Sequence, residues 1–340
     1  MADINDRAHL MRLVMGNMAS QTVRAAVELT VFDALGEHTR SAAEVAAELD
    51  LAEQPATRLL RALAGLGLCT EPEAGTFRAT PAGELLRTGH EHSVHAFASM
   101  FTDPVMTAAW AELPFSVRTG QTAFDEVFGK PFFAQLREEP EKSALFNASM
   151  HDGTVAVAET LASHYDFSGF GTALDIGGGD GTLLAPVLRE HPNLHGVVFD
   201  SAEGGAQAPE RLAAAGVGDR ASVTAGDFFS AVPGGADVYL IKSILHDWDD
   251  DRCVTILRHC RTVIPDDGVL LIIEPVLPEL ADPALAGLYL SDLNMLVNVG
   301  GRERTRAEFV QLCERAGFGL STAGPIPGTA FWLLEAQPAR

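Results

Sequence analysis

The sequence predicts an α/β protein in which a doubly wound, mostly parallel sheet follows an N-terminal region of helices. After Phe167, short apolar runs compatible with β-strands alternate with helical patterns, as in such a sheet. A glycine-rich turn at residues 177–181 separates one such run from the next helical pattern. At 340 residues the chain exceeds what one core usually supports, so two domains are the default.

The first helical pattern, from about residue 7 to residue 35, has an unusually broad apolar face. Such a helix needs cover on several sides, which a second subunit would supply. Burial within its own domain is the alternative. We therefore predict a homodimer formed through the N-terminal helices, and the apolar residues of this face are Leu10, Leu13, Val14, Met18, Val23, Val27, Leu29, Val31 and Leu35.

Residues 41–87 have the order helix, helix and hairpin, which is typical of a winged helix. Ser41 and Glu44 form a capping-box pattern, a second helical pattern runs over 54–66, and a short hairpin is predicted over 67–79. Winged helices of regulators bind DNA, but here seven acidic side chains accompany four arginines. A structural or dimerisation role is therefore expected for this domain, placed at 1–100.

Residues 101–165 are expected to form a helical connecting layer that contributes to a substrate pocket. The pattern is rich in Phe and Met, which are more often plain core but also suit a flat aromatic ligand. Breaks are expected at Pro104, Pro114, Pro131 and Pro140. Just before this layer, the trio His90, His92 and His95 has no acid or cysteine at helical spacing to complete a metal site.

The predicted catalytic domain occupies residues 166–340. Its strands are expected at 172–176, 194–200, 221–225, 236–241 and 268–274, and its helices at 181–190, 204–215 and 249–264. A terminal hairpin, 319–324 with 330–335, is expected to close one edge of the sheet.

Charge and composition exclude several classes of partner. The formal net charge of −22 opposes binding to nucleic acid and to anionic membranes. No apolar run approaches the length of a membrane span, and no signal-like segment is present, so a cytoplasmic location is expected. The four cysteines are scattered, which predicts reduced thiols rather than a disulfide or zinc site.

The glycine turn favours one cofactor class. Its glycines at 177, 179 and 181 give G-x-G-x-G instead of the dinucleotide fingerprint G-x-G-x-x-G. Asp175 lies two residues before the first of them, near the end of the strand, and a carboxylate there would repel a pyrophosphate but suit a cation. Together these features indicate S-adenosylmethionine, whose sulfonium is positively charged.

Polar residues follow the predicted strands at the edge where doubly wound sheets bind ligands. Asp200 lies 25 residues after Asp175, where a carboxylate can accept hydrogen bonds from ribose hydroxyls. His246 follows the fourth strand and could remove a proton from a phenol, although a lone histidine is usually structural. For each aspartate taken singly, a turn or helix-cap role competes. The remaining members of this set are Asp227, Lys242 and Glu274.

Four motifs together resemble the small-molecule O-methyltransferases of the plant caffeate type and their bacterial relatives in polyketide and antibiotic pathways. They are LDIGGGDG at 174–181, GDFF at 226–229, IKSILHDWDD at 241–250 and GGRERT at 300–305. The resemblance covers nearly the whole chain. It implies a Rossmann-like methyltransferase domain behind a winged-helix-like dimerisation domain.

The resemblance also implies a role for each matching residue. Gly177, Gly179 and the adjoining Asp175 would hold the amino-acid part of S-adenosylmethionine, which is converted to S-adenosylhomocysteine without a metal. His246 would be the general base, oriented by Glu274 and Glu303. The remaining contacts would be Asp200 for the ribose, Asp227 and Phe228 for the adenine, Lys242 in the same pocket, and Met150, Met295 and Asn298 for an aromatic acceptor.

Two other functions compete with methyl transfer to an aromatic hydroxyl. A relative of this family could keep the cofactor fold for hydroxylation or rearrangement of a natural product, but retention of His246, Glu274 and Glu303 opposes this. A winged-helix regulator that senses the cofactor is opposed by the acidic 41–87 stretch.

Overall fold

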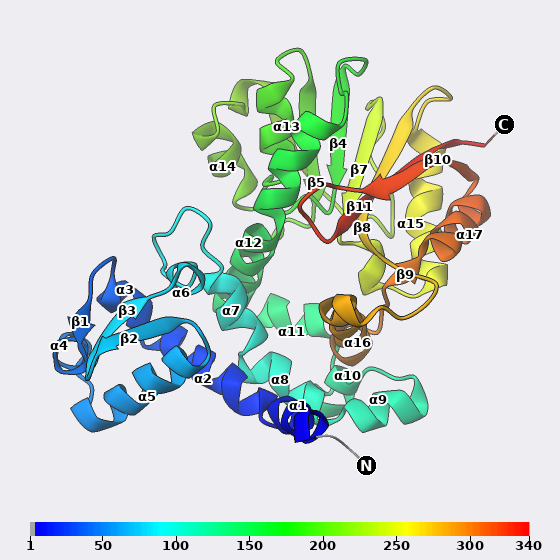
Figure 1. Ribbon diagram of the computed structural model, residues 1–340. Coiled ribbons are helices and arrows are strands. Elements are labelled where there is room, and N and C mark those ends of the chain that lie inside the picture. The colour runs from blue at the N-terminus through cyan, green and yellow to red at the C-terminus, as the bar shows by residue number, and fades with distance from the viewer. Residues whose placement is uncertain (1–3, 340) are drawn as a thin grey trace. The chain divides into compact units, whose positions relative to one another are not determined.

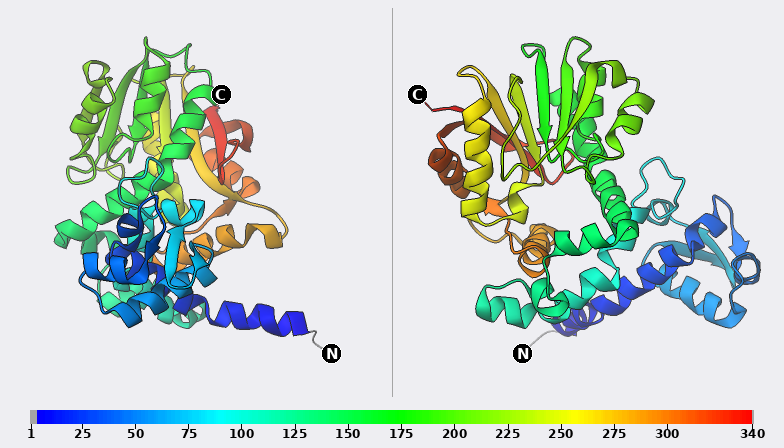
Figure 2. Two further views of the ribbon diagram at one scale, coloured as in Figure 1. Left: turned by 60° about the vertical axis from the view of Figure 1, so that its left-hand side comes forward. Right: turned by 180° about the vertical axis from the view of Figure 1, so that it is seen from behind.

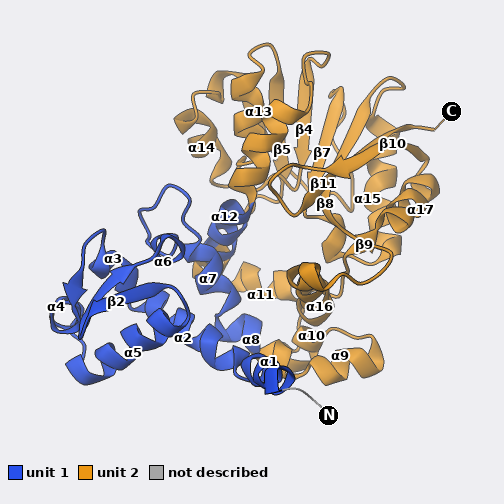
Figure 3. Ribbon diagram, viewed as in Figure 1, with its two compact units in different colours: residues 1–107, 144–153 blue, residues 108–143, 154–340 orange. Residues whose placement is uncertain are grey.

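The computed structural model describes residues 4–339, which form two compact units (Figure 3). The first unit comprises residues 1–107 and 144–153, and the second comprises 108–143 and 154–340. The division of the chain into 1–100, 101–165 and 166–340 stays a prediction, since it concerned the role of each segment.

The N-terminal apolar pattern forms three helices, α1 (Ile4–Val14), α2 (Gly16–Glu28) and α3 (Val31–Leu35). The single continuous helix predicted here is therefore wrong. Thr30 has a left-handed backbone with φ of 51°, which ends the helical path before α3. Side chains from the end of α2 onward, such as Val27 and Leu35, are buried in the first unit, whereas Leu13 on α1 is 64% exposed.

The winged-helix pattern is confirmed within the first unit. Helices α4 (Ala42–Glu48) and α5 (Glu53–Gly65) are followed by the antiparallel strands β2 (Cys69–Glu73) and β3 (Thr76–Ala79). Strand β1 (Arg40–Ser41) completes a three-stranded sheet in the order β1-β3-β2. The Ser41–Glu44 capping box forms as expected. Two further helices of this unit are α6 (Pro81–Glu84) and α7 (His95–Phe101).

The proline-rich middle segment is helical, and its prolines lie where helices begin. Pro104 and Pro140 are first residues, Pro114 is a second residue, and Pro131 precedes its helix. Proline is tolerated there because the first backbone N–H groups of a helix have no partner within it. The helices are α8 (Pro104–Ala111), α9 (Leu113–Thr119), α10 (Ala123–Phe128), α11 (Phe132–Glu138) and α12 (Pro140–His164).

The second unit contains the predicted sheet (Figure 1). Its main path runs β10-β11-β8-β7-β4-β5-β6, in which β8, β7, β4, β5 and β6 are parallel and the β10–β11 hairpin is antiparallel at one edge. The strands are β4 (Thr172–Ile176), β5 (His195–Asp200), β6 (Ala221–Ala225), β7 (Val238–Lys242), β8 (Val269–Leu277), β10 (Phe318–Pro325) and β11 (Phe331–Pro338).

Helices cover both faces of this sheet (Figures 1 and 2). Side chains alternate along each strand, so Leu174 and Ala173 belong to different buried clusters on opposite faces. One cluster includes α15 (Asp250–Val263) and α17 (Arg306–Ala316), and the other includes α12, α13 (Leu184–Glu190) and α14 (Ala208–Ala214). The sequence did not predict α17, α16 (Ala286–Asn298) or the short β9 (Arg304–Thr305), which pairs with β8.

The strand order reverses between β4 and β7, and this is what positions the site. From β4 the chain moves outward to β5 and β6, and it then returns to the other side of β4 as β7 and β8. The carboxyl ends of β4 and β7 therefore lie side by side at a switch point, where doubly wound sheets bind ligands. Among the residues described, no helix has both the length and the apolar character needed to cross a bilayer.

Candidate active site

The glycine turn after β4 requires glycine for two different reasons. Gly177 has φ of 67°, and a Cβ there would lie 2.4 Å from Cδ1 of Ile244. Gly179 has φ of 55°, so its backbone conformation alone disfavours a side chain. Residues 177–179 therefore pass close to the segment that follows β7, with a backbone that carries no side chains.

Asp175 is the penultimate residue of β4 and carries a buried carboxyl group just before this turn. The residue is only 1% exposed, and its Oδ2 has no hydrogen-bond partner among the described residues. Burial, reinforced by the nearby charge of Asp200, raises the pKa of Asp175 to about 8. A cationic ligand would stabilise the ionised form of this group.

Asp200 connects the end of β5 to the glycine turn. Its Oδ2 accepts a hydrogen bond from the Gly179 N–H at 2.8 Å, and its Oδ1 accepts one from the Ser201 N–H at 2.6 Å. Burial raises its pKa. Each carboxylate oxygen has a second lone pair, so both can still accept a hydrogen bond from a ligand hydroxyl.

Asp227 follows β6 and stabilises its own turn. Its Oδ1 accepts from the Phe229 N–H at 2.9 Å, and its Oδ2 accepts from the Ser230 hydroxyl at 2.8 Å. The neighbouring Phe228 ring reaches the glycine turn, since its Cε1 lies 3.8 Å from where a Cβ of Gly177 would be. The turn thus supplies a carboxylate and an aromatic face at the same rim.

Lys242 ends β7 as a largely desolvated amine. Burial lowers its pKa to about 8, against the opposing charges of Glu274 and Asp175. Its Nζ donates to the Ser243 hydroxyl at 2.9 Å and lies 4.6 Å from the centroid of the Phe331 ring. It therefore contributes a cation between the ends of β4 and β8.

His246 lies on a one-turn 3₁₀ helix, Leu245–Asp247, just beyond β7. We call residues 244–248 the His246 turn. Glu274 on β8 holds its start, because Oε1 accepts from the N–H groups of Ile244 at 2.9 Å and Leu245 at 2.8 Å. The histidine side chain is 15% exposed, so it is confined yet remains accessible.

The imidazole directs one nitrogen at two buried carboxylates. Nδ1 lies 3.2 Å from Glu303 Oε1 and 3.6 Å from Glu274 Oε2. A carboxylate accepts hydrogen bonds, so Nδ1 carries the proton and Nε2 is left as the basic atom. This is the arrangement that fixes a histidine tautomer for proton transfer.

Glu303 is itself held by residues that the sequence analysis did not identify. Its Oε1 accepts from the Ser291 hydroxyl at 2.9 Å, and its backbone N–H donates to Asp292 Oδ1 at 2.8 Å. Both partners lie on α16, which was not predicted, and the only available signal was the polar pair within an apolar helical pattern.

The carboxylates determine the charge of His246. Burial alone would lower its pKa, but Glu274, Glu303 and Asp247 together raise it to about 10. Asp247 Oδ1 lies 3.7 Å from Nε2, and burial raises the pKa of Asp247 to about 7. Burial likewise raises the pKa of Glu274. In the protein alone, His246 is therefore mainly an imidazolium at neutral pH, with a proton on Nε2 as well as on Nδ1.

The histidine and the two glutamates of this site also offer the donor atoms of a metal site. One ligand atom from each of His246, Glu274 and Glu303 lies within 4.8 Å of the others. The expectation of a reaction without metal therefore stays a prediction. The hydrogen bond from Nδ1 to Glu303 is the alternative use of this donor set.

Two of the predicted acceptor contacts lie on α16, in the same unit as His246. Met295 is 9% exposed and Asn298 is 1% exposed. The Asn298 side-chain amide donates to Asn294 Oδ1 at 2.8 Å, which also accepts from the Trp110 indole at 3.0 Å. Met150 belongs to the first unit, so its part in an acceptor site stays a prediction.

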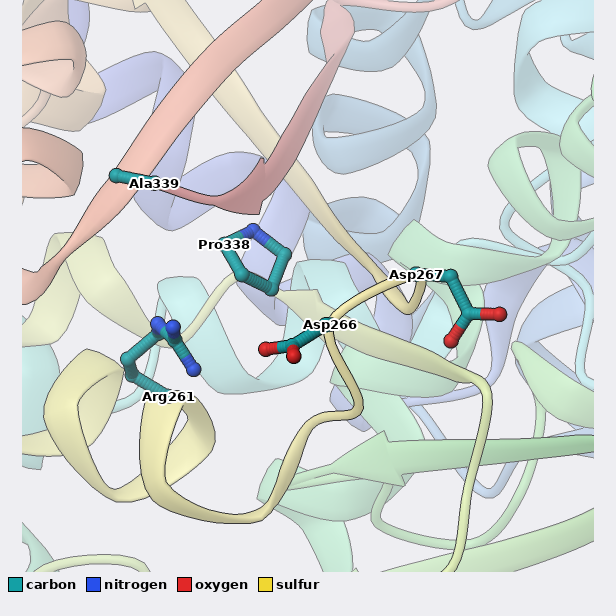
Figure 4. A pocket seen from close by; sticks show the side chains of 5 residues that line it. All are labelled: Arg261, Asp266, Asp267, Pro338 and Ala339. Carbon is teal, nitrogen blue, oxygen red and sulfur yellow. The ribbon is translucent and has the colours of Figure 1, made fainter.

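A separate hollow of about 580 Å³ lies away from these groups (Figure 4). It is lined by Arg261, Asp266, Asp267, Pro338 and Ala339. The two aspartates precede β8, which places the hollow at the amino end of the parallel strands. Ligands of doubly wound sheets bind at the opposite, carboxyl edge.

Sequence comparison establishes the family. The pattern of an O-methyltransferase domain matches residues 110–319, and that of an O-methyltransferase dimerisation domain matches residues 11–89. The chain belongs to the O-methyltransferase family. The resemblance drawn from the four sequence motifs is thereby confirmed.

Individual relatives agree over nearly the full chain. O-demethylpuromycin-O-methyltransferase of Streptomyces alboniger is 47% identical and covers 99% of this chain and 90% of its own length. The crystal structure of LaPhzM superposes with a TM-score of 0.92 at 38% identity, covering 98% of this chain and 99% of that chain. An O-methyltransferase from neocarzinostatin biosynthesis, solved with S-adenosylmethionine and 2-hydroxy-5-methyl naphthoic acid, gives 0.78 at 34% identity over 94% and 95%.

Proposed function

We propose that this O-methyltransferase methylates a phenolic hydroxyl of an aromatic secondary metabolite, with S-adenosylmethionine as methyl donor and His246 as general base. The observation that carries the proposal is the His246 Nδ1 directed at Glu303 and Glu274 beside the glycine turn. The naphthoic acid bound to the neocarzinostatin relative supports an aromatic acceptor.

The residues at the switch point fit S-adenosylmethionine. Asp175 offers an unsatisfied buried carboxyl oxygen, and Gly177 and Gly179 leave backbone open to a ligand. Asp200 suits the ribose hydroxyls, while Asp227, Phe228 and Lys242 suit the adenine end. When bound, S-adenosylmethionine would supply a methyl group activated by the sulfonium charge.

The proposed work of His246 is to hold the acceptor hydroxyl and take its proton. A phenol has a pKa near 10, so it needs a base as its oxygen attacks. In the neutral form of the imidazole, Nε2 is available for this, because Nδ1 is committed to the carboxylates. Glu303 and Glu274 stabilise the imidazolium that results.

Further parts of the proposal concern the acceptor and the assembly. Met150, Met295 and Asn298 are proposed to contact the acceptor, the methionines as adaptable apolar surface. The dimerisation-domain match supports a homodimer through the N-terminal helices, where α1 exposes Leu10 and Leu13 by 59% and 64%.

The test is transfer of labelled methyl from S-adenosylmethionine to a panel of phenols and polycyclic aromatic polyketides. His246→Ala should lower turnover by roughly two to four orders of magnitude and leave cofactor affinity nearly unchanged. Wild-type turnover in this variant would remove His246 from the mechanism. An assay with a chelator runs alongside, and loss of activity there would replace proton transfer by metal ligation as the role of the three groups.

A further inference from the structure

Arg304 is a fully buried cation that directly follows Glu303. It is 0% exposed and ranks among the largest fully buried side chains of the described residues. A buried guanidinium is costly unless its donors are satisfied. Its Nη2 and Nε bind Asp250 Oδ1 at 2.9 and 3.1 Å, so one part of that cost is offset by an ion pair.

The remaining donors of Arg304 bind the backbone on both sides of His246. Nη1 donates to the Leu245 carbonyl at 2.8 Å and also to the Arg302 carbonyl at 3.3 Å, and Nη2 donates to the Trp248 carbonyl at 2.7 Å. The N–H groups at the start of the His246 turn are already bound by Glu274. The turn is thus held through its N–H groups by one site residue and through its carbonyls by Arg304.

The same short segment that supplies Glu303 also packs against the His246 turn. A Cβ on Gly301 would lie 2.0 Å from the His246 carbonyl oxygen and 2.7 Å from the Trp248 nitrogen. Arg304 pairs with Val276 in the β8–β9 ladder, two residues beyond Glu274. The position of both carboxylates and the position of the turn are therefore set by one pair of strands.

We propose that Arg304 is a positioning residue for His246, which holds the imidazole where its Nδ1 meets Glu303 and its Nε2 meets the acceptor. This inference rests on the proposed function, in which His246 is the base. Arg304 acts through the backbone of the His246 turn and does not itself touch a substrate. Nearby, Arg302 provides a contrast, because it also pairs with Asp250, at 3.0 Å, but is 41% exposed on its side chain.

The matched variants are Arg304→Lys and Arg302→Lys. Lysine keeps the charge but replaces the planar fork of donors by a single flexible ammonium group. The Leu245 carbonyl keeps one partner in Arg304→Lys, because the Cys253 thiol also donates to it at 3.1 Å. Arg302→Lys changes the same side-chain type and the same Asp250 pair without altering the contacts to the turn.

Two readouts separate positioning from general stabilisation. The first is kcat, which should fall by about 10- to 100-fold in Arg304→Lys, as for a small misplacement of a catalytic group. The second is the NMR titration of His246 in the unliganded protein, with the signal assigned by its loss in His246→Ala. Its pKa should fall by about one unit or more, because the imidazole moves away from Glu303. Arg302→Lys should alter neither.

Three outcomes would overturn the proposal. The first is a folded Arg304→Lys variant with the kcat and the His246 titration of the wild type. The second is an equal loss of kcat in Arg302→Lys, since it would assign the effect to the Asp250 pair. The third is a fall in kcat with an unaltered His246 titration, which would make Arg304 only a stabiliser of the fold. If His246→Ala retains activity, the proposed function fails, while the titration still decides the role of Arg304.

A second variant covers the case in which Arg304→Lys does not fold. Asp250→Asn changes a side chain that is 38% exposed, so the fold should tolerate it. It weakens the ion pair that orients the guanidinium, and we expect a smaller fall in the His246 pKa in the same direction. If Arg304→Lys does not fold and the His246 pKa is unchanged in Asp250→Asn, the proposal is refuted.

Discussion

Replacing Glu303 by glutamine removes one negative charge next to His246 while keeping the shape of the side chain. The amide oxygen of glutamine can still accept from Nδ1, so the ring orientation is kept. The lost charge lies 3.2 Å from Nδ1, and an opposite charge at such a distance shifts a pKa by about one to three units. We therefore expect Glu303→Gln to lower the pKa of His246 from about 10 to about 7 to 9.

The direction of the pH effect follows from the sign of this shift. A histidine whose pKa is raised keeps its proton below that pKa, so its neutral form is about one part in a thousand at pH 7 when the pKa is about 10. In the wild type, kcat/KM should climb about tenfold per pH unit toward pH 10. In Glu303→Gln the climb should end one to three units lower, at a reduced plateau because the imidazole is a weaker base.

The assay is a pH profile of kcat/KM at saturating S-adenosylmethionine below about pH 10, where the phenol is still protonated and where the wild type should still be climbing while Glu303→Gln levels off. Glu308→Gln is the matched control, since Glu308 pairs with Arg302 and caps α17 outside the site. An acid limb that does not move in Glu303→Gln, or a wild-type midpoint near 6.5, would refute the claim that the carboxylates set the pKa of His246.

Two further predictions concern the cofactor and the assembly. Burial raises the pKa of Asp175 to about 8, so below that pH a bound cation must displace its proton. Calorimetry of cofactor binding in two buffers should therefore detect more proton release in the wild type than in Asp175→Asn, and equal release would exclude Asp175 as the counter-ion. Leu13 on α1 is 64% exposed, and Leu13→Glu should convert a dimer to a monomer in sedimentation, whereas a wild-type protein that is already monomeric would contradict the predicted interface.

Local patterns predicted most of the fold because they depend on neighbouring residues. The strand at 172–176, the Ser41 cap and the edge hairpin required only periodicity and turn chemistry. The continuous N-terminal helix failed because its apolar spacing persists across Thr30, whose left-handed backbone no glycine or proline signals. The apolar pattern of α16 is interrupted by Ser291, Asp292 and Asn294, which are polar because two of them hold Glu303 and the third binds Trp110.

The site itself was only partly accessible to reasoning from the residues alone. Strand ends placed Asp175, Asp200 and Glu274 at one edge, because parallel strands share a carboxyl end. The pairing of His246 with Glu303 came from the family resemblance, since 57 residues and an unpredicted helix separate them. The GGRERT motif includes Arg304 but assigns it no role, because a buried arginine can be distinguished from a surface one only when its acceptors are known.

A pKa of about 10 for His246 is compatible with its work as a base because its partner in the reaction has nearly the same pKa. An imidazolium beside a phenolate has the same total number of protons as an imidazole beside a phenol. The reactive complex can therefore form from either combination of enzyme and acceptor. With matched pKa values, transfer of the proton costs little free energy at the moment of attack. The carboxylates of Glu303 and Glu274 therefore do not make His246 a free base at neutral pH. They match its proton affinity to the acceptor, and this makes the position of the imidazole, held by Glu274 and by the proposed contacts of Arg304, the property on which the rate depends.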